Sequence, residues 1–252
     1  MTARISVVIP CHNYGAFLDD AVGSVLRQTR PADEVILIDD GSTDDSAEIL
    51  QRLAPTIPNA HVTIRAQAMG PSTTFNDGVR ASTGDCFVIL SADDRLSSNY
   101  LQETASALER EPDAAFAYCG EWLFGAINEI HPVHPFVLAD FRRENFINGS
   151  ALMRREMFDA VGGFVTEFDT IGLEDWEFWI KAMELGYRGV PVESAWLEYR
   201  RHVAGSRNDY SPFGHTRARV ALRRRHPTVI RRRDVARWFM RAATRKLIRS
   251  GR

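Results

Sequence analysis

Apolar residues in this chain form short runs that alternate with stretches of helical spacing. Runs rich in β-branched residues predict strands over residues 5–9, 34–38, 62–65 and 86–90. Between and after them, apolar residues recur every three or four positions, which predicts helices over 18–26, 47–53, 72–81 and 100–109. This alternation indicates right-handed crossovers and an α/β fold with a largely parallel sheet.

The alternation stops after Pro112. Strands are expected at 114–119 and 150–153, but residues 121–146 between them are aromatic, proline-bearing and irregular. Such a segment more often shapes a pocket wall or lid than a core layer. Beyond it, the pattern predicts helices over 155–161 and from Glu174 to near Gly186, short strands at 190–192 and 196–199, and a helical tail.

The charge of the chain is unevenly distributed. Its 252 residues are 44% hydrophobic and 25% charged, as in an ordinary globular protein, and the formal net charge is −2. Residues 217–252 nevertheless hold 14 of the 31 basic residues and one of the 33 acids. The chain therefore has an acidic body and a basic tail.

Cysteine usage and the N-terminus both indicate a cytoplasmic protein. Cys11, Cys86 and Cys119 are far apart and odd in number, which favours buried free thiols over a disulfide framework or a zinc site. The chain runs from Met1 directly into a predicted strand without signal-peptide architecture. Its apolar runs are also too short to span a membrane.

Three pairs of acids lie where a strand ends or a helix begins. They are Asp39–Asp40, Asp93–Asp94 and Glu174–Asp175. In open α/β sheets, ligands bind beyond the carboxyl ends of the strands, where adjacent aspartates can hold a divalent cation against a phosphorylated ligand. Acids also favour such turns simply because they stabilise the first turn of a helix. Each pair alone fits both interpretations, and the three together favour a site.

Five segments together resemble the family 2 glycosyltransferases, which have the nucleotide-sugar-binding GT-A fold. The segments are ISVVIPCHN (5–13), EVILIDDGSTD (34–44), GPSTTFNDG (70–78) with ASTGD (81–85), LSADD (90–94), and GGF (162–164) with EDWE (174–177). They occur in the family's order, and the resemblance extends to His202. It implies a Rossmann-like, mixed and mostly parallel sheet flanked by helices. It also implies a catalytic domain over 1–215, with a nucleotide-binding half (1–112) and an acceptor-side half (113–215), followed by a basic helical extension (216–252).

The resemblance also implies roles for individual residues. The nucleotide site would be lined by Pro10, His12, Asn13, Asp40, Asn76 and Asp93. A divalent cation, Mn²⁺ or Mg²⁺, would be held by Asp94, Asp93 and His202. Asp175 would be the general base, with Glu174 as the competing candidate. For His12 a surface turn, and for His202 a solvated side chain, remain the alternatives.

Two positions depart from the family pattern. Ser91 stands where the first acid of the Asp-x-Asp metal motif is usual, and Phe75 stands where an arginine is usual before Asn76. Metal binding survives in relatives with the x-Asp-Asp form, so the first departure does not exclude activity. The contacts to the ribose and phosphates of the donor are less well supported by the sequence.

The function implied is that of an inverting glycosyltransferase. It would move a sugar from a nucleotide-diphosphate donor, expected to be a UDP-sugar, to a hydroxyl of a glycan or lipid-linked acceptor by single displacement. One alternative is a catalytically silent nucleotide-sugar-binding protein, and Ser91 is its support. Nucleotidyl transfer would need a phosphate loop rich in glycine and lysine, and residues 10–15 contain no lysine.

The basic tail allows two interpretations. Five apolar residues fall at helical spacing with most arginines off that stripe: Val235, Trp238, Phe239, Ala242 and Ala243. This pattern is typical of helices that rest on anionic membranes, so residues 226–252 would make a peripheral contact at the inner face of the membrane. Alternatively, Trp238 and Phe239 pack back onto the domain. Nucleic-acid binding is not expected, because the body is acidic.

Overall fold

The first half of the chain alternates strands and helices as the hydrophobic pattern predicts. In the computed structural model, which describes residues 3–202, 212–238 and 240, its strands are β1 (Ile5–Cys11), β2 (Glu34–Asp39), β3 (Ala60–Ile64) and β4 (Cys86–Ile89). Its helices are α1 (Leu18–Leu26), α2 (Ser46–Leu53), α3 (Pro71–Ala81) and α4 (Tyr100–Arg110). β1 pairs in parallel with β2 and β4, and β2 pairs in parallel with β3. Each of these elements ends within two residues of its predicted bounds.

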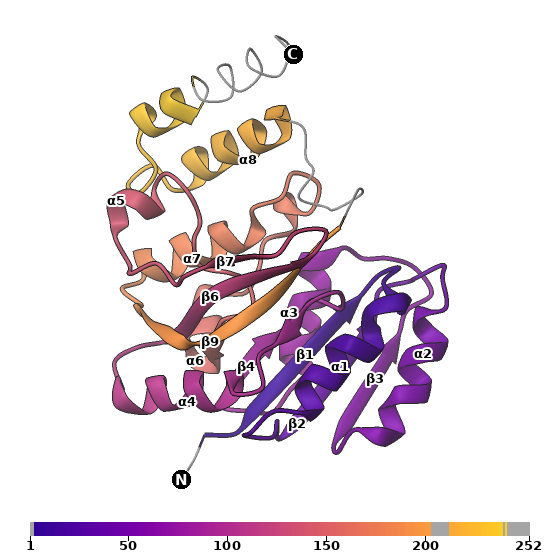
Figure 1. The fold of residues 1–252 in the computed structure, drawn as a ribbon. Coiled ribbons are helices and arrows are strands. Elements are labelled where there is room, and N and C mark those ends of the chain that lie inside the picture. The colour runs from indigo at the N-terminus through magenta and orange to yellow at the C-terminus, as the bar shows by residue number, and fades with distance from the viewer. Residues whose placement is uncertain (1–2, 203–211, 239, 241–252) are drawn as a thin grey trace.

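The second half extends the same sheet and adds helices above it (Figure 1). Its strands are β5 (Arg95–Leu96), β6 (Phe116–Gly125), β7 (Glu129–His131), β8 (Leu152–Arg154) and β9 (Gly189–Arg201). Its helices are α5 (Leu138–Phe141), α6 (Arg155–Val161), α7 (Glu174–Glu184) and α8 (Pro212–Arg225). In the described residues the strand order is β3-β2-β1-β4-β8-β6-β9-β5, and β7 pairs with β6. The long ladders are parallel and the antiparallel ladders are short, so the sheet is mixed and mostly parallel, as expected.

Three strand predictions in this half were wrong or incomplete. β6 does not end at Cys119 but continues to Gly125, because it pairs with β9 along its whole length. The two short strands expected at 190–192 and 196–199 are parts of one strand, β9. The hydrophobic pattern breaks between them because the strand is irregular there: Val192 and Trp196 pair with consecutive residues of β6. The two-residue strand β5 was not predicted, because it is too short to show a period.

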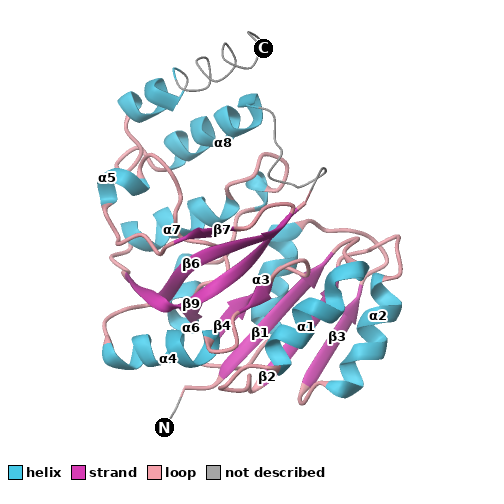
Figure 2. Cartoon of the chain, in the orientation of Figure 1, coloured by secondary structure: helices cyan, strands magenta, loops and turns pink. Residues whose placement is uncertain are grey.

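Helices cover both faces of the sheet (Figure 2), so each face belongs to a separate apolar core. Alternate residues of β1 divide between them: Val7 lies in the first core and Val8 in the second. The first core is closed by α1, α2 and α4, and the second by α3, α6, α7 and α8. Cys11, Cys86 and Cys119 are free and buried, as the sequence predicts.

The described part of the basic tail packs on the preceding part of the chain. α8 and a following helical segment, 232–238, lie against α7, and Leu222, Ile230 and Trp238 are buried in the second core. Trp238 meets Trp176 with ring centroids 5.7 Å apart and donates from Nε1 to the Arg143 carbonyl at 3.0 Å. The packing interpretation therefore holds for Trp238. Phe239, Ala242 and Ala243 lie outside the described residues.

The boundary predicted at residues 215 and 216 remains a prediction, although the buried tail residues share a core with α7. In the part of the chain that the structure describes, none of the helices has the length and apolar character needed to cross a bilayer.

Candidate active site

The parallel pairing of β1, β2 and β4 brings three loops to one edge of the sheet. Cys11 at the end of β1 is in register with Asp39 at the end of β2, and Val8 is in register with Ile89 at the end of β4. The residues that follow these strands therefore meet at the carboxyl edge, where α/β sheets bind ligands. This places the loops at 12–14, 40–44 and 91–94 together.

Asp94 is buried at this edge, with 3% of its surface exposed. Its Oδ1 accepts a hydrogen bond of 2.8 Å from the backbone N–H of Arg200 on β9. Burial, and then the charge of the adjacent Asp93, raises the pKa of the Asp94 carboxyl well above its usual value. A carboxyl in such surroundings is ionised more readily when a cation lies beside it.

The Arg200 side chain holds the Asp93–Asp94 turn in place. Its Nε donates to the Asp93 carbonyl at 2.8 Å, and its Nη2 pairs with Asp20 at 2.7 Å. The guanidinium lies between two rings, 4.7 Å from the centroid of Phe17 and 4.4 Å from that of Phe124. Nothing in the sequence indicated this role, since Arg200 is one of two adjacent arginines at the end of β9.

His202 lies beside the same pair of acids. Its Nε2 is 2.8 Å from Asp93 Oδ2, and its ring is stacked on Tyr14 and edge-on to Phe17. Adjacent carboxylates with a neighbouring imidazole are a donor set that suits Mg²⁺ or Mn²⁺. In the described residues, however, no three such side chains are already gathered around one point. The donor chemistry therefore fits a metal, and the predicted ligand set stays a prediction.

Asp40 is buried and both of its carboxylate oxygens are used within the protein. Oδ1 accepts from the backbone N–H of Met69 and from Arg65 Nη1, and Oδ2 accepts from the backbone N–H of Gly70. These bonds outweigh the effect of burial and lower the pKa of Asp40. Asp40 thus fixes the loop before α3, and Arg65, which sequence reasoning missed, fixes Asp40. The predicted contact of Asp40 with the nucleotide stays a prediction.

Three other predicted nucleotide contacts lie at the end of β1. Pro10 is within the strand. His12 is exposed, with Nδ1 2.7 Å from the Asp40 carbonyl. Asn13 has a positive φ of 58° and accepts from the backbone N–H of Thr43 at 2.7 Å. These bonds join the first loop to the second, so His12 stands at the carboxyl edge with part of its surface open.

Asn76, by contrast, is engaged in the fold. Its side chain donates to the carbonyl of Phe164 at 2.9 Å and accepts from the backbone N–H of the same residue at 2.8 Å. Phe75 packs edge-on against Phe164, with centroids 5.4 Å apart. The phenylalanine that replaces the family's arginine therefore joins the second core. Here the Asn76 amide binds the segment before α7, and its predicted donor contact stays a prediction.

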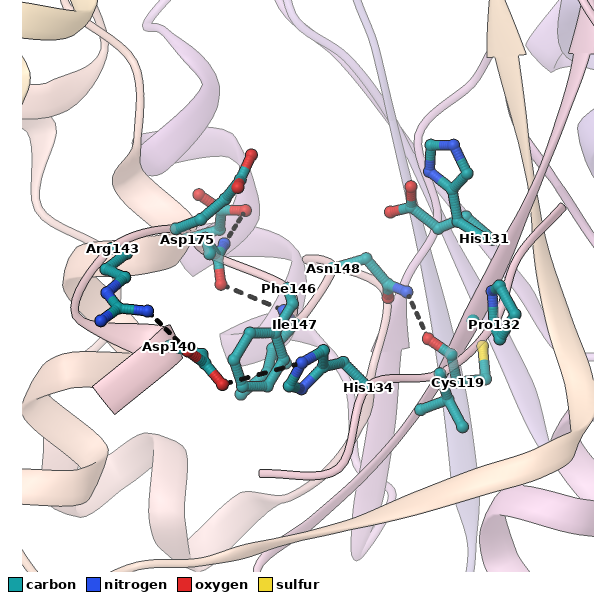
Figure 3. Close-up of a pocket in the computed structure, with 15 residues that line it drawn as sticks. Cys119, His131, Pro132, His134, Asp140, Arg143, Phe146, Ile147, Asn148 and Asp175 are labelled. Carbon is teal, nitrogen blue, oxygen red and sulfur yellow. Dashed lines mark hydrogen bonds and ion pairs between the residues drawn. The ribbon is translucent and has the colours of Figure 1, made fainter. Parts of the chain in front are cut away.

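A pocket of about 510 Å³ lies beside β6, and its wall includes much of the irregular segment 121–146 (Figure 3). Asp175, in the first turn of α7, lines it and accepts a hydrogen bond from Asn145 Nδ2 at 2.8 Å. Its other oxygen accepts from the backbone N–H of Trp176 at 2.7 Å. Glu174 does not line the pocket. Of the two predicted acids, the geometry therefore brings Asp175 to a space that can hold a substrate.

Glu121 lies near the Asp93–Asp94 pair, because it pairs with Leu197 of β9, which pairs in turn with Leu96, two residues after Asp94. It lines the pocket, and its charge contributes to the raised pKa of Asp94. Burial also raises the pKa of Glu121 itself. The sequence placed Glu121 at the start of an irregular segment, whereas the structure places it in the middle of β6. Sequence periodicity could not single it out, because its importance comes from its neighbours across the sheet.

Comparison with known proteins gives a consistent result. The family model for glycosyl transferase family 2 matches residues 6–169. Bacillus subtilis TuaG, whose name assigns it to teichuronic acid biosynthesis as a glycosyltransferase, is 25% identical over 204 residues, which is 78% of each chain. Three further curated relatives, each named a glycosyltransferase, are 34% or 35% identical over 42% to 51% of this chain. This chain spans only 33% to 38% of their length.

Two solved structures share the fold. S. aureus TarS (residues 1–349), in complex with UDP-GlcNAc, has a TM-score of 0.72 at 15% identity, with 87% of this chain and 65% of that chain covered. The mannosyltransferase PcManGT from Pyrobaculum calidifontis, in complex with GDP-Man and Mn²⁺, has a TM-score of 0.65 at 19% identity, with 100% and 80% covered. At these identities the likeness establishes the fold alone, and the fold is the one expected from the sequence.

Proposed function

Because the chain belongs to glycosyl transferase family 2, we propose that it transfers a sugar from a nucleotide-diphosphate donor to an acceptor hydroxyl. One observation carries this proposal: Asp175 lines a pocket whose wall includes Glu121, and Glu121 lies across β9 from the residues that directly follow the buried Asp93–Asp94 pair. In the proposed reaction the donor is held at these acids and the acceptor beside Asp175, so that binding brings the reacting groups together.

The donor would bind at the carboxyl edge of β1, β2 and β4, against Pro10, His12, Asn13 and Asp93. We propose a UDP-sugar, because TarS, which shares the fold, binds UDP-GlcNAc. The GDP-Man complex of PcManGT shows that this fold also accepts another base in another protein. The Asp40 carboxylate already accepts hydrogen bonds from the backbone N–H groups of Met69 and Gly70. To contact the base or ribose, Asp40 would have to accept a further hydrogen bond or lose one of these two.

Asp94, with Asp93 and His202, would hold Mn²⁺ or Mg²⁺. When bound, the cation neutralises charge that develops on the leaving diphosphate. Support comes from the donor set described above and from the Mn²⁺ in PcManGT. The His202–Asp93 contact would have to rearrange for both side chains to face the cation.

Asp175 would remove the proton from the attacking hydroxyl, since it is the predicted acid that lines the pocket. Its bond from Asn145 would fix the orientation of the carboxylate. Attack on the face opposite the leaving diphosphate would invert the anomeric configuration. The acceptor would be a glycan or a lipid-linked glycan, and the polysaccharide role implied by the name of TuaG supports this class.

Two measurements test this function. Thermal shift with a panel of nucleotide sugars, with and without Mn²⁺, should show a higher Tm for the true donor, because a ligand that binds the native state alone stabilises it. Proton NMR of the product should then show an anomeric configuration opposite to that of the donor. Retention would exclude single displacement. Donor binding without turnover over a broad acceptor panel would favour the silent binding protein that Ser91 also allows.

We further propose a cytoplasmic protein that contacts the inner face of the membrane through residues 226–252. Trp238 is buried, so in the described part of the tail this contact would rest on charge. Arg231, Arg232 and Arg233 are exposed and would meet anionic lipid.

A further inference from the structure

A second pocket, of about 280 Å³, lies between the segment after α5 and the helical segment 232–238. It is lined by Arg143, Asp234, Arg237 and Trp238. Trp238 closes it, because its indole is anchored by the hydrogen bond to the Arg143 carbonyl and by the contact with Trp176. The basic tail therefore forms one wall and the catalytic body the other.

This pocket adjoins the candidate acceptor pocket. Arg143 lines both cavities. On α7, Asp175 lines the larger pocket, and the next residue, Trp176, contacts Trp238 of the smaller one. The two cavities are thus neighbours along one wall, and a ligand longer than one sugar that fills the first can reach the second.

The smaller pocket has an excess of positive charge. Arg237 is exposed, and it makes no hydrogen bond or ion pair with another described residue. Arg143 pairs with Asp140 at 3.2 Å, but both side chains are about half exposed, so this pair competes weakly with a ligand. The one acid of the lining, Asp234, already uses Oδ2 to accept from the backbone N–H of Arg231.

Its surroundings add further donors. The guanidinium of Arg219 lies 5.0 Å from the ring centroid of Trp238. The indole N–H of Trp176, a residue 1% exposed, has no hydrogen-bond partner in the described part of the chain. A pocket lined by two arginines, with a third close to its Trp238 wall, is suited to an oxyanion, which guanidinium groups bind through paired hydrogen bonds.

We propose that this pocket is an acceptor subsite that binds an anionic group, a phosphate or a carboxylate, carried by the acceptor glycan. The inference rests on the proposed function, because it takes the larger pocket as the place of the acceptor hydroxyl. The substrate class then narrows from glycans in general to acidic glycans whose charged group lies beyond the reacting sugar. Arg143 and Arg237 bind the anion, and Trp238 forms the wall beside it.

The subsite can be tested without a donor or turnover. The full chain, labelled with ¹⁵N, is titrated with inorganic phosphate while the indole N–H signal of Trp238 is followed by NMR. That signal is assigned with Trp238→Phe. We expect a saturable shift, with affinity at least about tenfold weaker in Arg143→Gln and in Arg237→Gln, as one charge-assisted hydrogen bond is lost. Arg224→Gln is the matched control, since Arg224 is an exposed tail arginine outside the lining.

The alternatives give different results. An unsaturable shift, or equal weakening by Arg224→Gln, would overturn the subsite in favour of general charge. Glucose 1-phosphate should move the Trp238 signal and glucose should not; equal shifts from both would also overturn it. Loss of binding to phosphatidylglycerol vesicles in Arg237→Gln would assign the pocket to a lipid headgroup instead. Phosphate binding that persists while no sugar transfer is found would leave the subsite standing and remove the proposed function alone.

Discussion

At the scale of single residues, Asp175 and Glu174 are neighbours in sequence with different surroundings. Asp175 faces the larger pocket and is held by Asn145, whereas Glu174 does not line it. We predict that Asp175→Asn lowers the transfer rate by about two or more orders of magnitude, because general-base catalysis is lost, with donor affinity nearly unchanged. Steady-state kinetics and donor binding measure the two effects. If Glu174→Gln were inactive and Asp175→Asn active, Glu174 would be the general base instead of Asp175.

Asp94 gives the second residue-scale prediction. Asparagine keeps an oxygen that can accept from the Arg200 N–H, so Asp94→Asn should fold with a Tm close to that of the wild type. It removes a carboxylate from the predicted metal site, and we therefore expect Mn²⁺-dependent donor binding and turnover to disappear. Calorimetric titration of donor with and without Mn²⁺ checks this. Full activity in the variant, or in excess EDTA, would contradict the metal assignment.

The acids proposed for the site stand out in the sequence because each ends an apolar run or begins a helix. Their partners do not stand out. Arg65, directly after β3, reaches Asp40 at the end of the neighbouring strand, and Arg200 reaches Asp93 and Asp94 from more than a hundred residues away. Such contacts depend on strand order and register, which a periodic pattern does not contain. The same holds for Asn76, whose motif position suggested a ligand contact but whose amide binds Phe164.

At the scale of elements, the parallel half was predictable because its strands are buried on both faces and stand out as apolar runs. The segment 121–146 was harder. The strands β6 and β7 do not show a regular alternation of apolar and polar residues, since Trp122 and Glu129 are exposed. Backbone hydrogen bonds to neighbouring strands stabilise them instead. The irregular, aromatic and proline-bearing character of this segment still indicated a pocket wall correctly, since ten of its residues line the larger cavity, Pro132 and Phe146 among them.

The junction of α7 with α8 contains a buried ionic cluster that makes tail docking sensitive to pH. Glu177, 0% exposed, pairs with Arg225 at 3.1 Å and lies 3.2 Å from His226, whose other nitrogen is 2.7 Å from Glu184. Burial alone would lower the pKa of His226, but Glu177 and Glu184 outweigh it and raise the pKa above its ordinary value of 6.5. Charged His226 is therefore favoured in the folded state.

The sign of the effect follows from linkage. A histidine whose pKa is raised in the folded state stabilises the protein fully at pH values below its unfolded pKa, about 6.5. This contribution to the free energy of unfolding is lost as the pH rises through the pKa of the folded state. We predict that the Tm of the wild type falls from pH 6 upward more steeply than that of His226→Gln. Thermal unfolding over this range measures the difference. His61→Gln, at an exposed position on β3, is the control, and an equal slope in all three proteins would contradict the role of the cluster.

At the scale of the whole molecule, the described part of the tail packs on the rest of the chain. Ile230 and Trp238 share the second core with α7, so cutting the chain after Arg225 would expose Trp176 and disturb the pocket wall. The charge of the tail must therefore be tested by substitutions on its exposed face. The exposed arginines of this face include Arg231, Arg232 and Arg233.

For the membrane contact we predict that the full chain cosediments with vesicles containing phosphatidylglycerol and less so as salt rises, because salt screens exposed charges. Arg232→Gln with Arg233→Gln should weaken binding about thirtyfold, since each arginine near an anionic surface contributes about 1 kcal/mol. Arg27→Gln with Arg110→Gln, two exposed arginines of the body, removes the same charge elsewhere and should change binding little. Equal losses in both double variants would mean that only net charge matters, and absence of binding by the wild type would leave the tail with a structural role alone.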